Sequence, residues 1–542
     1  MRRVFPKQEA LHGVVGQAFQ IWPEPQARLG VSRNPFRLWL VWLLGAVLAS
    51  LPVLVAPLPP LRQFFFNLVR VEVLANPAAY ARDFVIHWSA IPDLAMDLTV
   101  PWMAKFMSVE AAAQLFLLCT LALLSSGTLM LSRAIHRRWS ALPLLSFLFL
   151  YNWILIRGFE NNLFGLGLAL WGLAAHISLR HSAVLRVAAS SLSALIIYFC
   201  HLFPLGVFAL VVGTWELSRL FQERATKRRI LIHAAPAMMP FVLPAVLLWS
   251  SSTGGLAGAI EFGIFQPFLK IKICLEALTI GNRVVDALVL VSVGLAAIAA
   301  VGRRWLTCPP EFWLTLIAIP LTALVFAPFS AFASQGIIER CAVAFTFLLI
   351  ALFDLRPTDL KLQRLAAAVL TLVFIIRIGT ITADWRAAED IIQEYRQAFA
   401  SLRPGSVMLQ VSQDIEDTSP LSYPHLWNPP LGSIVALATL NGVFVPELYL
   451  KAGQQPVLYR DEDQSLRVFQ YYSTERRKVR YADDTVLTAW AAELRERFPE
   501  LHSHFTAVYV AVWDPSRRLC DSFPGGQLLA TLEQHRIYKL AP

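Results

Sequence analysis

The sequence predicts an α-helical polytopic membrane protein with about eleven transmembrane helices and a C-terminal extracytoplasmic α/β domain. Hydrophobic residues make up 56% of the 542 residues, only 15% are charged, and the mean hydropathy is +0.54. A soluble globular chain carries about 25% charged residues. The charge is also uneven, because residues 383–542 hold 16 basic and 20 acidic side chains while the preceding part is strongly basic. We therefore expect membrane lipids and no nucleic acid among the partners.

The apolar runs define the expected membrane body. Residues 1–35 are polar and contain several Arg, which predicts a cytoplasmic N-terminal segment before a retained first helix. Runs of about 17–25 apolar residues can cross a bilayer as helices. Eleven such runs lie near residues 36–56, 109–132, 140–156, 161–179, 184–200, 202–220, 230–250, 284–302, 310–328, 341–355 and 363–382. The body thus covers residues 36–382, with a long first outward loop at 57–108, in which LRQFFFNLVRVEVL (61–74) predicts a helix lying in the membrane interface.

Basic residues at the ends of the apolar runs predict a cytoplasmic N-terminus. With that orientation the cytoplasmic segments collect 21 Lys and Arg, whereas the outward loops of the body hold 9 over a longer total length. Loops that stay in the cytoplasm are enriched in Lys and Arg. We expect a multi-pass protein of the bacterial inner (cytoplasmic) membrane, with residues 383–542 on the extracytoplasmic side.

The chain after residue 383 alternates helical and extended patterns. AAEDIIQEYRQAFASL predicts an amphipathic helix that leaves the membrane, and SVMLQVS predicts a strand. TAWAAELRERF predicts a further helix and FTAVYVAVW a buried strand, which together indicate a small α/β domain. This region contains no Gly-rich phosphate loop and no GxSxG motif.

Two acidic residues of the first outward loop are the candidate catalytic residues. In IPDLAMDLTVPW we expect a short helix after Pro92, with Asp93 and Asp97 on one face at positions i and i+4. Asp93 suits either a helix cap or a role with substrate. Asp97 lies among apolar residues, where a carboxylate needs a partner, a metal or a substrate. Because a carboxylate above the membrane can deprotonate an acceptor hydroxyl, Asp97, or alternatively Asp93, is the candidate base.

Polar residues near these carboxylates are candidates for substrate binding. His87 lies four residues after Asp83, which favours a structural His–Asp pair, and His87 is also kept as a substrate-binding candidate. Glu160 and Asn161 in RGFENNLFGLGLALW form either a capped polar turn or a rim that hydrogen-bonds a sugar.

Three later residues are candidates for binding a phosphate. His201 in YFCHLFPLG ends an outward helix, as an interfacial residue or as a donor to phosphate. Lys270 lies among apolar residues, where it either snorkels to the interface or binds an anionic headgroup or pyrophosphate. Arg340 begins the tenth run and either binds phosphate, held in place by Glu339, or joins a local ion pair.

No metal site is assigned from the sequence. The six cysteines are scattered without zinc-type spacing, and Asp93 and Asp97 are spaced DxxxD rather than as a DxD pair. No cofactor is therefore predicted, and a requirement for a divalent metal stays open.

A multi-span body with a cytoplasmic N-terminus, a long acidic first loop with an interfacial helix, and an outward C-terminal domain together resemble the GT-C-type membrane glycosyltransferases. The motifs of this chain resemble those of a branch of bacterial multi-span proteins with the same layout, and they are HWSAIPDLAMDLTVP, RGFENNLFGLGLALW, YFCHLFPLG and FVPELYLKAGQQPVLY. The resemblance implies a GT-C-like body and transfer of a hexosyl or pentosyl unit from a polyprenyl-phosphate-linked donor. The acceptor would be a lipid or glycan of the cell envelope, and a first-loop Asp the base. The chain departs from the family pattern in placing these acidic residues far from the first span and in having no WWD-type signature.

Two other function classes are weighed against the transferase. A transporter or flippase of lipid-linked glycans predicts polar residues inside spans and internal repeats. A non-catalytic membrane scaffold with an outer partner-binding domain predicts that the loop carboxylates are dispensable. The positions of Asp93, Asp97, His201 and Arg340 in the folded chain discriminate among the three. Convergence on one cavity that opens sideways to lipid favours the transferase, and scatter over separate surfaces excludes it.

Overall fold

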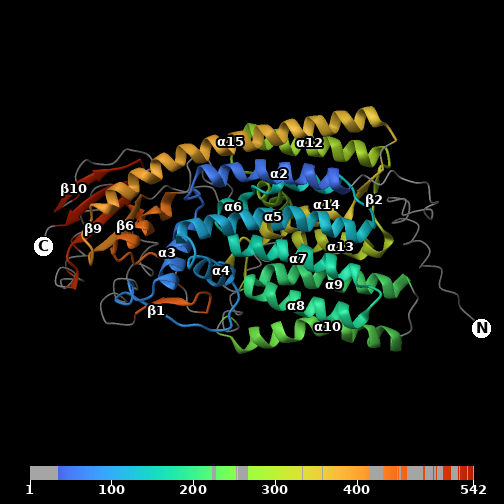
Figure 1. The fold of residues 1–542 in the computed structure, drawn as a ribbon, viewed down its shortest axis with the longest axis horizontal. Helices are drawn as coiled ribbons and strands as arrows, with labels where there is room; N and C mark the ends of the chain where they lie inside the picture. The colour runs from blue at the N-terminus through green and yellow to red at the C-terminus, as the bar shows by residue number, and fades with distance from the viewer. Residues whose placement is uncertain are drawn as a thin grey trace, which may run out of the picture.

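The computed structural model describes most of residues 35–540 (Figure 1). The segments outside this description are 1–34, 223–226, 252, 254–259, 261–265, 332–333, 357, 414–430, 449, 451–452, 461–479, 482–491, 493–495, 497–503, 514–522, 524, 534 and 541–542. Nearly all of the expected cytoplasmic segment, and most of the expected helix TAWAAELRERF, lie outside the described residues. Both stay predictions.

Helices form the body that the sequence predicts as membrane-embedded. Among the described residues, six helices are long and apolar enough to cross a membrane, which by length and composition makes this a multi-pass membrane protein. They are α2 (Pro35–Val55), α5 (Val109–His136), α8 (Ala183–Cys200), α9 (Leu202–Gln222), α12 (Arg283–Gly302) and α15 (Leu360–Ala400).

The remaining five expected spans are helical over much of their length, but their status as membrane spans stays a prediction. They comprise the 3₁₀ helix η1 (Leu142–Phe149) with α6 (Trp153–Ile156), α7 (Glu160–Ser178), α10 (Lys227–Ser250), η3 (Pro310–Phe312) with α13 (Trp313–Leu321) and η4 (Thr322–Phe326), and α14 (Ile337–Leu352). A short helix, α11 (Pro267–Glu276), packs against α14.

Small residues allow α5 and α7 to pack closely in the middle of the body. A Cβ added at Gly167 would lie 2.7 Å from the Cβ of Leu123, and one added at Gly127 would lie 2.9 Å from the Cβ of Leu170. Because lipid supplies no hydrophobic drive between helices, such close backbone approach is what makes their packing favourable. The first turn of α7 also packs against α4 (Ala95–Met103) of the first loop.

The first loop contains two helices and one strand, and the surroundings of one helix differ from the prediction. α3 (Phe64–Ala75) covers the segment expected to lie in the membrane interface, yet most of its side chains are buried inside the protein. The helix η5 (Leu431–Asn441), from far along the chain, and α5 both pack against it. The apolar residues of α3 are therefore covered by protein rather than by lipid.

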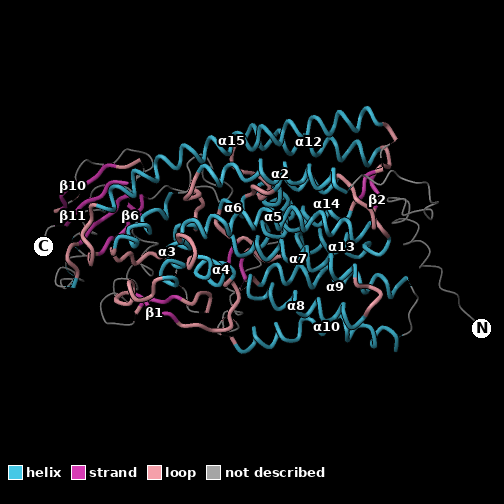
Figure 2. Tube along the Cα trace, in the orientation of Figure 1, coloured by secondary structure: helices cyan, strands magenta, loops and turns pink. Residues whose placement is uncertain are grey.

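A five-stranded mixed sheet lies at one end of the helical body (Figures 1 and 2). Its order is β10–β11–β9–β6–β8, with β6 parallel to β9 and β8, and β11 antiparallel to β9 and β10. The predicted strands SVMLQVS and FTAVYVAVW are confirmed as β6 and β9. The bounds are β6 (Val407–Gln413), β8 (Arg480–Tyr481), β9 (Val508–Trp513), β10 (Gly526–Thr531) and β11 (His535–Leu540).

Two further connections tie the sheet end to the body. α15 runs without a break through residue 383, where the sequence placed a domain boundary, and reaches the sheet (Figure 2). β1 (Phe84–Ile86) of the first loop pairs antiparallel with β7 (Val457–Tyr459), and the rings of Phe84 and Tyr459 lie 5.7 Å apart. The first loop is thus fixed to the C-terminal region by backbone and aromatic contacts.

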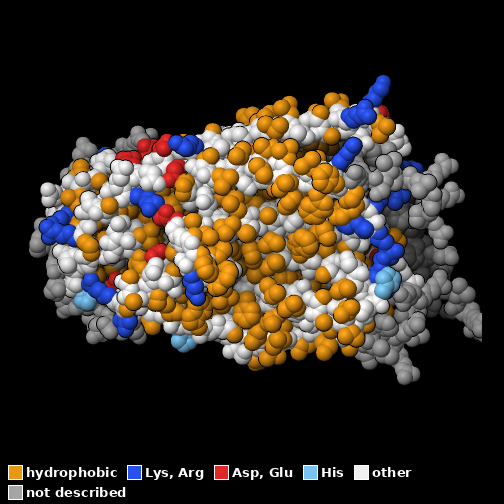
Figure 3. Space-filling model, viewed as in Figure 1, with side chains coloured by type: hydrophobic (Ala, Val, Ile, Leu, Met, Phe, Trp, Pro, Cys, Tyr) orange, Lys and Arg blue, Asp and Glu red, His pale blue; other side chains and the backbone are white. Residues whose placement is uncertain are grey.

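Charged side chains gather near the two ends of the body, while hydrophobic side chains cover its middle (Figure 3). At the end away from the sheet, Arg138 pairs with Asp354, and Arg303 lies 3.6 Å from Asp359. Two pairs of short strands lie in loops of the body. At this end, β2 (Leu306–Thr307) pairs with β5 (Asp354–Leu355), and just before α14, β3 (Ser330–Ala331) pairs with β4 (Ser334–Gln335).

Candidate active site

Asp97 forms a buried ion pair with an arginine of the same loop. It lies in the first turn of α4, with 1% of its surface exposed. Arg70 of α3 donates from Nε to Oδ1 at 2.6 Å and from Nη2 to Oδ2 at 3.3 Å, and it is 3% exposed. A two-pronged contact of this kind satisfies both oxygens of a carboxylate. The partner that Asp97 needed is therefore Arg70, which the sequence analysis did not single out.

Two polar residues, Asn67 and Glu160, continue the hydrogen-bond network on the far side of Arg70 from Asp97. Asn67, one helical turn before Arg70, accepts a hydrogen bond from Arg70 Nη1 at 2.9 Å and donates to Glu160 Oε2 at 2.8 Å. Glu160 is buried at the first position of α7, and no described residue donates to its Oε1. Glu160 is thus part of the network that supports the first loop and not of an open rim.

Asp93 lies just before α4 rather than on it. The helix begins at Ala95, Leu94 occupies the N-cap position, and no side chain caps it, so both the predicted cap and the shared i, i+4 face are wrong. The φ of Asp93 is 73°, in the left-handed region that costs a residue with a Cβ about 1–2 kcal/mol. Asn161 of α7 holds this turn by donating to the carbonyl of Asp93 at 2.8 Å and to Oδ1 at 3.1 Å.

The surroundings of Asp93 change its acidity. Burial raises the pKa of Asp93 to about 6, and the negative charge of Asp97 contributes to the increase. The charges of Arg70 and Arg340 and the hydrogen bond from Asn161 act in the opposite direction without cancelling it. The side chain keeps partial exposure, and no described residue donates to its Oδ2. Such a carboxyl can exchange a proton close to neutral pH.

Arg340 and His201, predicted separately, are in direct contact. Nη1 of Arg340 lies 2.7 Å from Nε2 of His201, and the guanidinium lies 4.4 Å from the centre of the Phe159 ring. Arg340 is 2% exposed. His201 lies between α8 and α9, where burial and the charge of Arg340 hold its pKa well below the usual range. The imidazole is therefore neutral.

Both ring nitrogens of His201 face an N–H donor. Nδ1 of His201 lies 3.0 Å from the backbone N–H of Phe203, and Nε2 lies 2.7 Å from Nη1 of Arg340. A neutral imidazole has one acceptor nitrogen, so the tautomer decides which of the two contacts is a hydrogen bond. An anionic oxygen is the kind of acceptor that the neighbouring guanidinium binds most strongly.

The remaining predicted phosphate ligands have partners that differ from expectation. Glu339 pairs with Arg157 at 3.9 Å, and its expected support of the neighbouring Arg340 stays a prediction. Lys270 is 2% exposed and donates to the carbonyl of Ala327 at 2.8 Å, so it does not snorkel to the interface. It lies on α11, which packs against the helix that carries Arg340.

His87 is the predicted site residue for which the structure records no contact with the others. It follows strand β1 and is exposed, and its backbone N–H donates to the carbonyl of Pro456 at 2.7 Å. The predicted pair with Asp83 is wrong, because an extended chain rises about 3.3 Å per residue and separates positions i and i+4 by about 13 Å.

The contacts thus join Asp93, Asp97, Asn161, His201 and Arg340 into one neighbourhood where α4, α7 and α14 meet the turn between α8 and α9. Among the described residues, no group of three or more His, Cys, Asp or Glu side chains is arranged to hold a metal ion. Arg70, Asn67 and Phe159 belong to the same neighbourhood but were not predicted. The signal for Arg70 was available, as the one Arg of a largely apolar helical stretch, residues 64–75.

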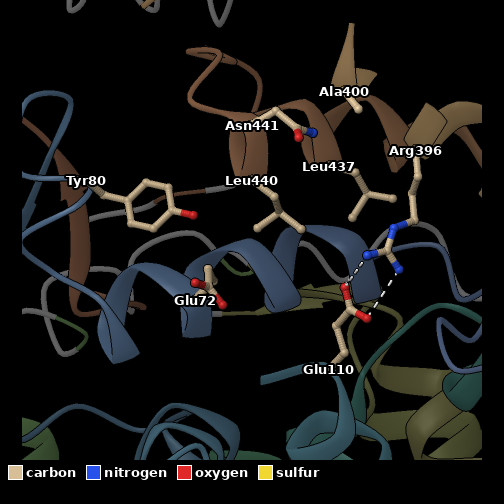
Figure 4. Close-up of a pocket in the computed structure, with 8 residues that line it drawn as sticks. All are labelled: Glu72, Tyr80, Glu110, Arg396, Ala400, Leu437, Leu440 and Asn441. Carbon is tan, nitrogen blue, oxygen red and sulfur yellow. Dashed lines mark hydrogen bonds and ion pairs between the residues drawn. The ribbon is translucent and has the colours of Figure 1, made fainter. Parts of the chain in front are cut away.

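A separate cleft of about 360 Å³ lies between the first loop and the C-terminal region (Figure 4). It is lined by Glu72, Tyr80, Glu110, Arg396, Ala400, Leu437, Leu440 and Asn441. Within it, Glu110 and Arg396 form an ion pair of 3.0 Å. Glu72 is two positions after Arg70 on α3, so the two side chains point to opposite sides of that helix. None of the predicted site residues lines this cleft.

Comparison with known proteins gives a structural likeness and no family assignment. No protein-family model and no curated protein matches the chain. The chain is similar over 93% of its length to a crystal structure of ArnT from Cupriavidus metallidurans bound to undecaprenyl phosphate, with 12% identity, a TM-score of 0.49 and 99% of that chain covered. For apo ArnT the values are 94%, 12%, 0.46 and 100%. At these TM-scores the likeness carries no argument about activity.

Proposed function

We propose that this protein is a GT-C-type membrane glycosyltransferase that moves a hexosyl or pentosyl unit from a polyprenyl-phosphate-linked donor to a lipid or glycan acceptor. The observation that carries the proposal is that the elevated-pKa carboxyl of Asp93 lies within electrostatic range of Arg340, which is in contact with His201. A transferase of this kind needs a base for the acceptor and positive charge for the departing phosphate, and both kinds of group are present in this neighbourhood.

The phosphate end of the donor is assigned to Arg340 and His201. The two side chains are in direct contact, and each carries N–H groups that can donate to a phosphate oxygen. Arg340 is always charged and can bind two phosphate oxygens at once. Lys270, on the neighbouring helix, adds positive charge to the region. Buried donors aimed at the leaving group stabilise the charge that develops there.

The acceptor end is assigned to Asp93. Its carboxylate takes the proton of an acceptor hydroxyl as that oxygen forms a bond to the anomeric carbon of the donor sugar. The bond between that carbon and the phosphate oxygen breaks, and the electron pair leaves on the polyprenyl phosphate. The configuration at the anomeric carbon is inverted. Because the leaving group is already a phosphate, catalysis consists mainly of positioning and charge compensation.

Asp97 is given a positioning role and not that of the base. Both of its oxygens are engaged by Arg70 and the side chain is buried, which keeps it from a substrate hydroxyl. Its ion pair fixes α4 on α3 and so positions the Asp93 turn. Asp97→Asn would leave Arg70 buried without its counter-charge, so we expect this change to reduce folding stability as well as transfer.

The site is proposed to face the extracytoplasmic side. The first loop and the sheet lie at one end of the body (Figure 1), whereas the basic loops around Arg138 and Arg303 lie at the other. Enrichment of basic residues on the cytoplasmic side supports a cytoplasmic N-terminus and an extracytoplasmic C-terminus.

One observation favours the transporter as a second candidate. Glu216 of α9 is buried between helices, 3.0 Å from Arg186 and 3.4 Å from Nε2 of His176. Ionisable groups within a helical membrane body are a feature of transport pathways. A flippase predicts movement of an intact lipid-linked glycan across liposomes without any sugar transfer.

The proposal is tested with purified protein in lipid nanodiscs and a panel of polyprenyl-phosphate-linked hexoses and pentoses. Release of free polyprenyl phosphate in the presence of envelope lipids or glycans is the expected result. Arg340→Gln should weaken binding of undecaprenyl phosphate about tenfold or more, since a charged hydrogen-bonding pair contributes about 1.5–3 kcal/mol. The matched control is Lys272→Gln, which removes a half-exposed cation of the same helix as Lys270 that pairs with Glu276 at 3.6 Å. No release from any donor, or equal binding by both variants, would contradict the proposal.

A further inference from the structure

α4 has its hydrophobic and polar faces reversed relative to a helix of a water-soluble protein. Leu98 and Trp102 on this helix, and Phe106 just after it, are 48%, 61% and 74% exposed. They recur at four-residue intervals, which places them along one side. The rings of Trp102 and Phe106 are in edge-to-face contact, with centroids 5.8 Å apart.

The opposite side of α4 faces the protein and carries the charge. Met96 and Val100 are fully buried there, together with Asp97 and its ion pair to Arg70. In water, a helix places its apolar side inward and its charged side outward. The arrangement in α4 is stable only if the outward side meets an apolar environment.

We infer that the outward side of α4 lies in the lipid bilayer, at the interface between headgroups and acyl chains. α4 packs against α5 and α8, both candidate membrane spans, and each of them also exposes apolar side chains, such as Leu115 and Leu192. The exposed side of α4 is thus continuous with the hydrophobic surface of the body, which Figure 3 shows from one side.

The residue types on this side fit a lipid interface. Trp is enriched where headgroups meet acyl chains, because its ring is apolar and its N–H is polar. Lys105 is exposed between Trp102 and Phe106, where its ammonium group can reach anionic headgroups. The interfacial helix of the first loop is therefore α4, and not the segment 61–74 that the sequence indicated.

This placement has a consequence for the Asp93 turn, which directly precedes α4. A helix seated about 5–10 Å into the interface holds that turn at the depth of lipid headgroups. Loss of the lipid contact should loosen α4 and the ion pair on its inner side. The inference concerns where the helix lies and holds whether or not the protein transfers sugar.

The test places a fluorescent non-canonical amino acid at position 106 of the full chain in nanodiscs that contain anionic phospholipid. Matched labels at Leu192, on the candidate span α8, and at Leu528, on strand β10, provide the lipid and water references, since all three positions are exposed. Fluorescence is then quenched either by aqueous iodide or by a phospholipid that carries a nitroxide near its headgroup.

The expected result at position 106 is strong quenching by the nitroxide lipid and severalfold weaker quenching by iodide than at position 528. Iodide quenching at position 106 equal to that at position 528 would overturn the inference. Protection from both quenchers would also overturn it, because it would mean that a protein surface covers α4. Phe106→Ser, which keeps the buried side of α4 unchanged, should lower the thermal midpoint in nanodiscs, because a polar side chain then replaces an apolar one in lipid. A midpoint equal to that of the unsubstituted protein would count against a lipid contact.

Discussion

Two neighbouring turns of the first loop place two carboxylates in very different environments. In the first turn of α4, Asp97 is closed off by Arg70, and both of its oxygens are satisfied. In the turn before it, Asp93 has a left-handed backbone, partial exposure and a pKa raised to about 6. The first arrangement is typical of a buried structural ion pair, and the second is typical of a reactive group.

The comparison teaches that burial alone does not identify a base. Both carboxyl groups are surrounded by protein, but only Asp97 has a full counter-charge. The desolvation of Asp93 is only partly compensated, by Asn161 and by more distant positive charges. Incomplete compensation is what raises its proton affinity into the range useful for general base catalysis. The predictions below separate the two roles.

The largest expected effect is a loss of stability in Asp97→Asn. The substitution leaves Arg70 as an uncompensated buried charge, and removal of one partner of a buried pair costs about 3–5 kcal/mol of the free energy of unfolding. Thermal unfolding in nanodiscs measures the effect. Asp83→Asn is the matched control, because its pair with Arg82 is looser at 3.7 Å and partly exposed, and surface pairs contribute about 0–1 kcal/mol. Equal midpoints in the two variants would remove the structural role of Asp97.

The pH dependence of transfer should follow Asp93. A base acts in its deprotonated form, so below the pKa of about 6 the rate should fall about tenfold per pH unit, and above it the rate should level off. Initial rates of polyprenyl phosphate release between roughly pH 5 and 8 provide the profile. A rate that is constant across this range would argue against Asp93 as the base.

A smaller effect on stability is expected for Asp93→Gly. Glycine adopts positive φ without strain, but the change also removes the carboxylate that accepts from Asn161. The two effects are each about 1 kcal/mol, so the free energy of unfolding should change little while transfer is lost. Arg137→Gly is the control, because Arg137 ends α5 at φ 55° and is far from the site in sequence. It should raise the free energy of unfolding by about 1 kcal/mol without affecting transfer. An Asp93→Gly variant that still transfers sugar would argue against Asp93 as the base.

Much of the helical architecture could be predicted from the sequence, because apolar runs of sufficient length report lipid contact directly. All eleven expected segments contain helix, and two strands of the sheet were recognised from alternating apolar residues. The depth of the first-loop helices could not be predicted in this way. α3 is buried because η5, more than 350 positions later, packs on it, and a local apolar pattern contains no information about such a partner.

The contacts within the candidate site could not be predicted from local sequence patterns either. Arg340 and His201 were selected one by one from their chemistry, but they are 139 positions apart, and nothing local to either indicates their contact. Arg70 was passed over because its partner Asp97 lies 27 positions away on another helix. The spacing of Asp93 and Asp97 suggested a shared helical face, whereas the helix begins two residues too late for that. Pairing between elements is set by tertiary packing.

The central claim, that Asp93 is the base, is tested most directly by the single-turnover rate of sugar transfer in Asp93→Asn. Asn has the same size as Asp and tolerates left-handed backbone, so the thermal midpoint should stay unchanged. The rate of polyprenyl phosphate release should fall at least about 100-fold, the usual contribution of a general base. A folded Asp93→Asn variant that transfers sugar at the wild-type rate would contradict the account.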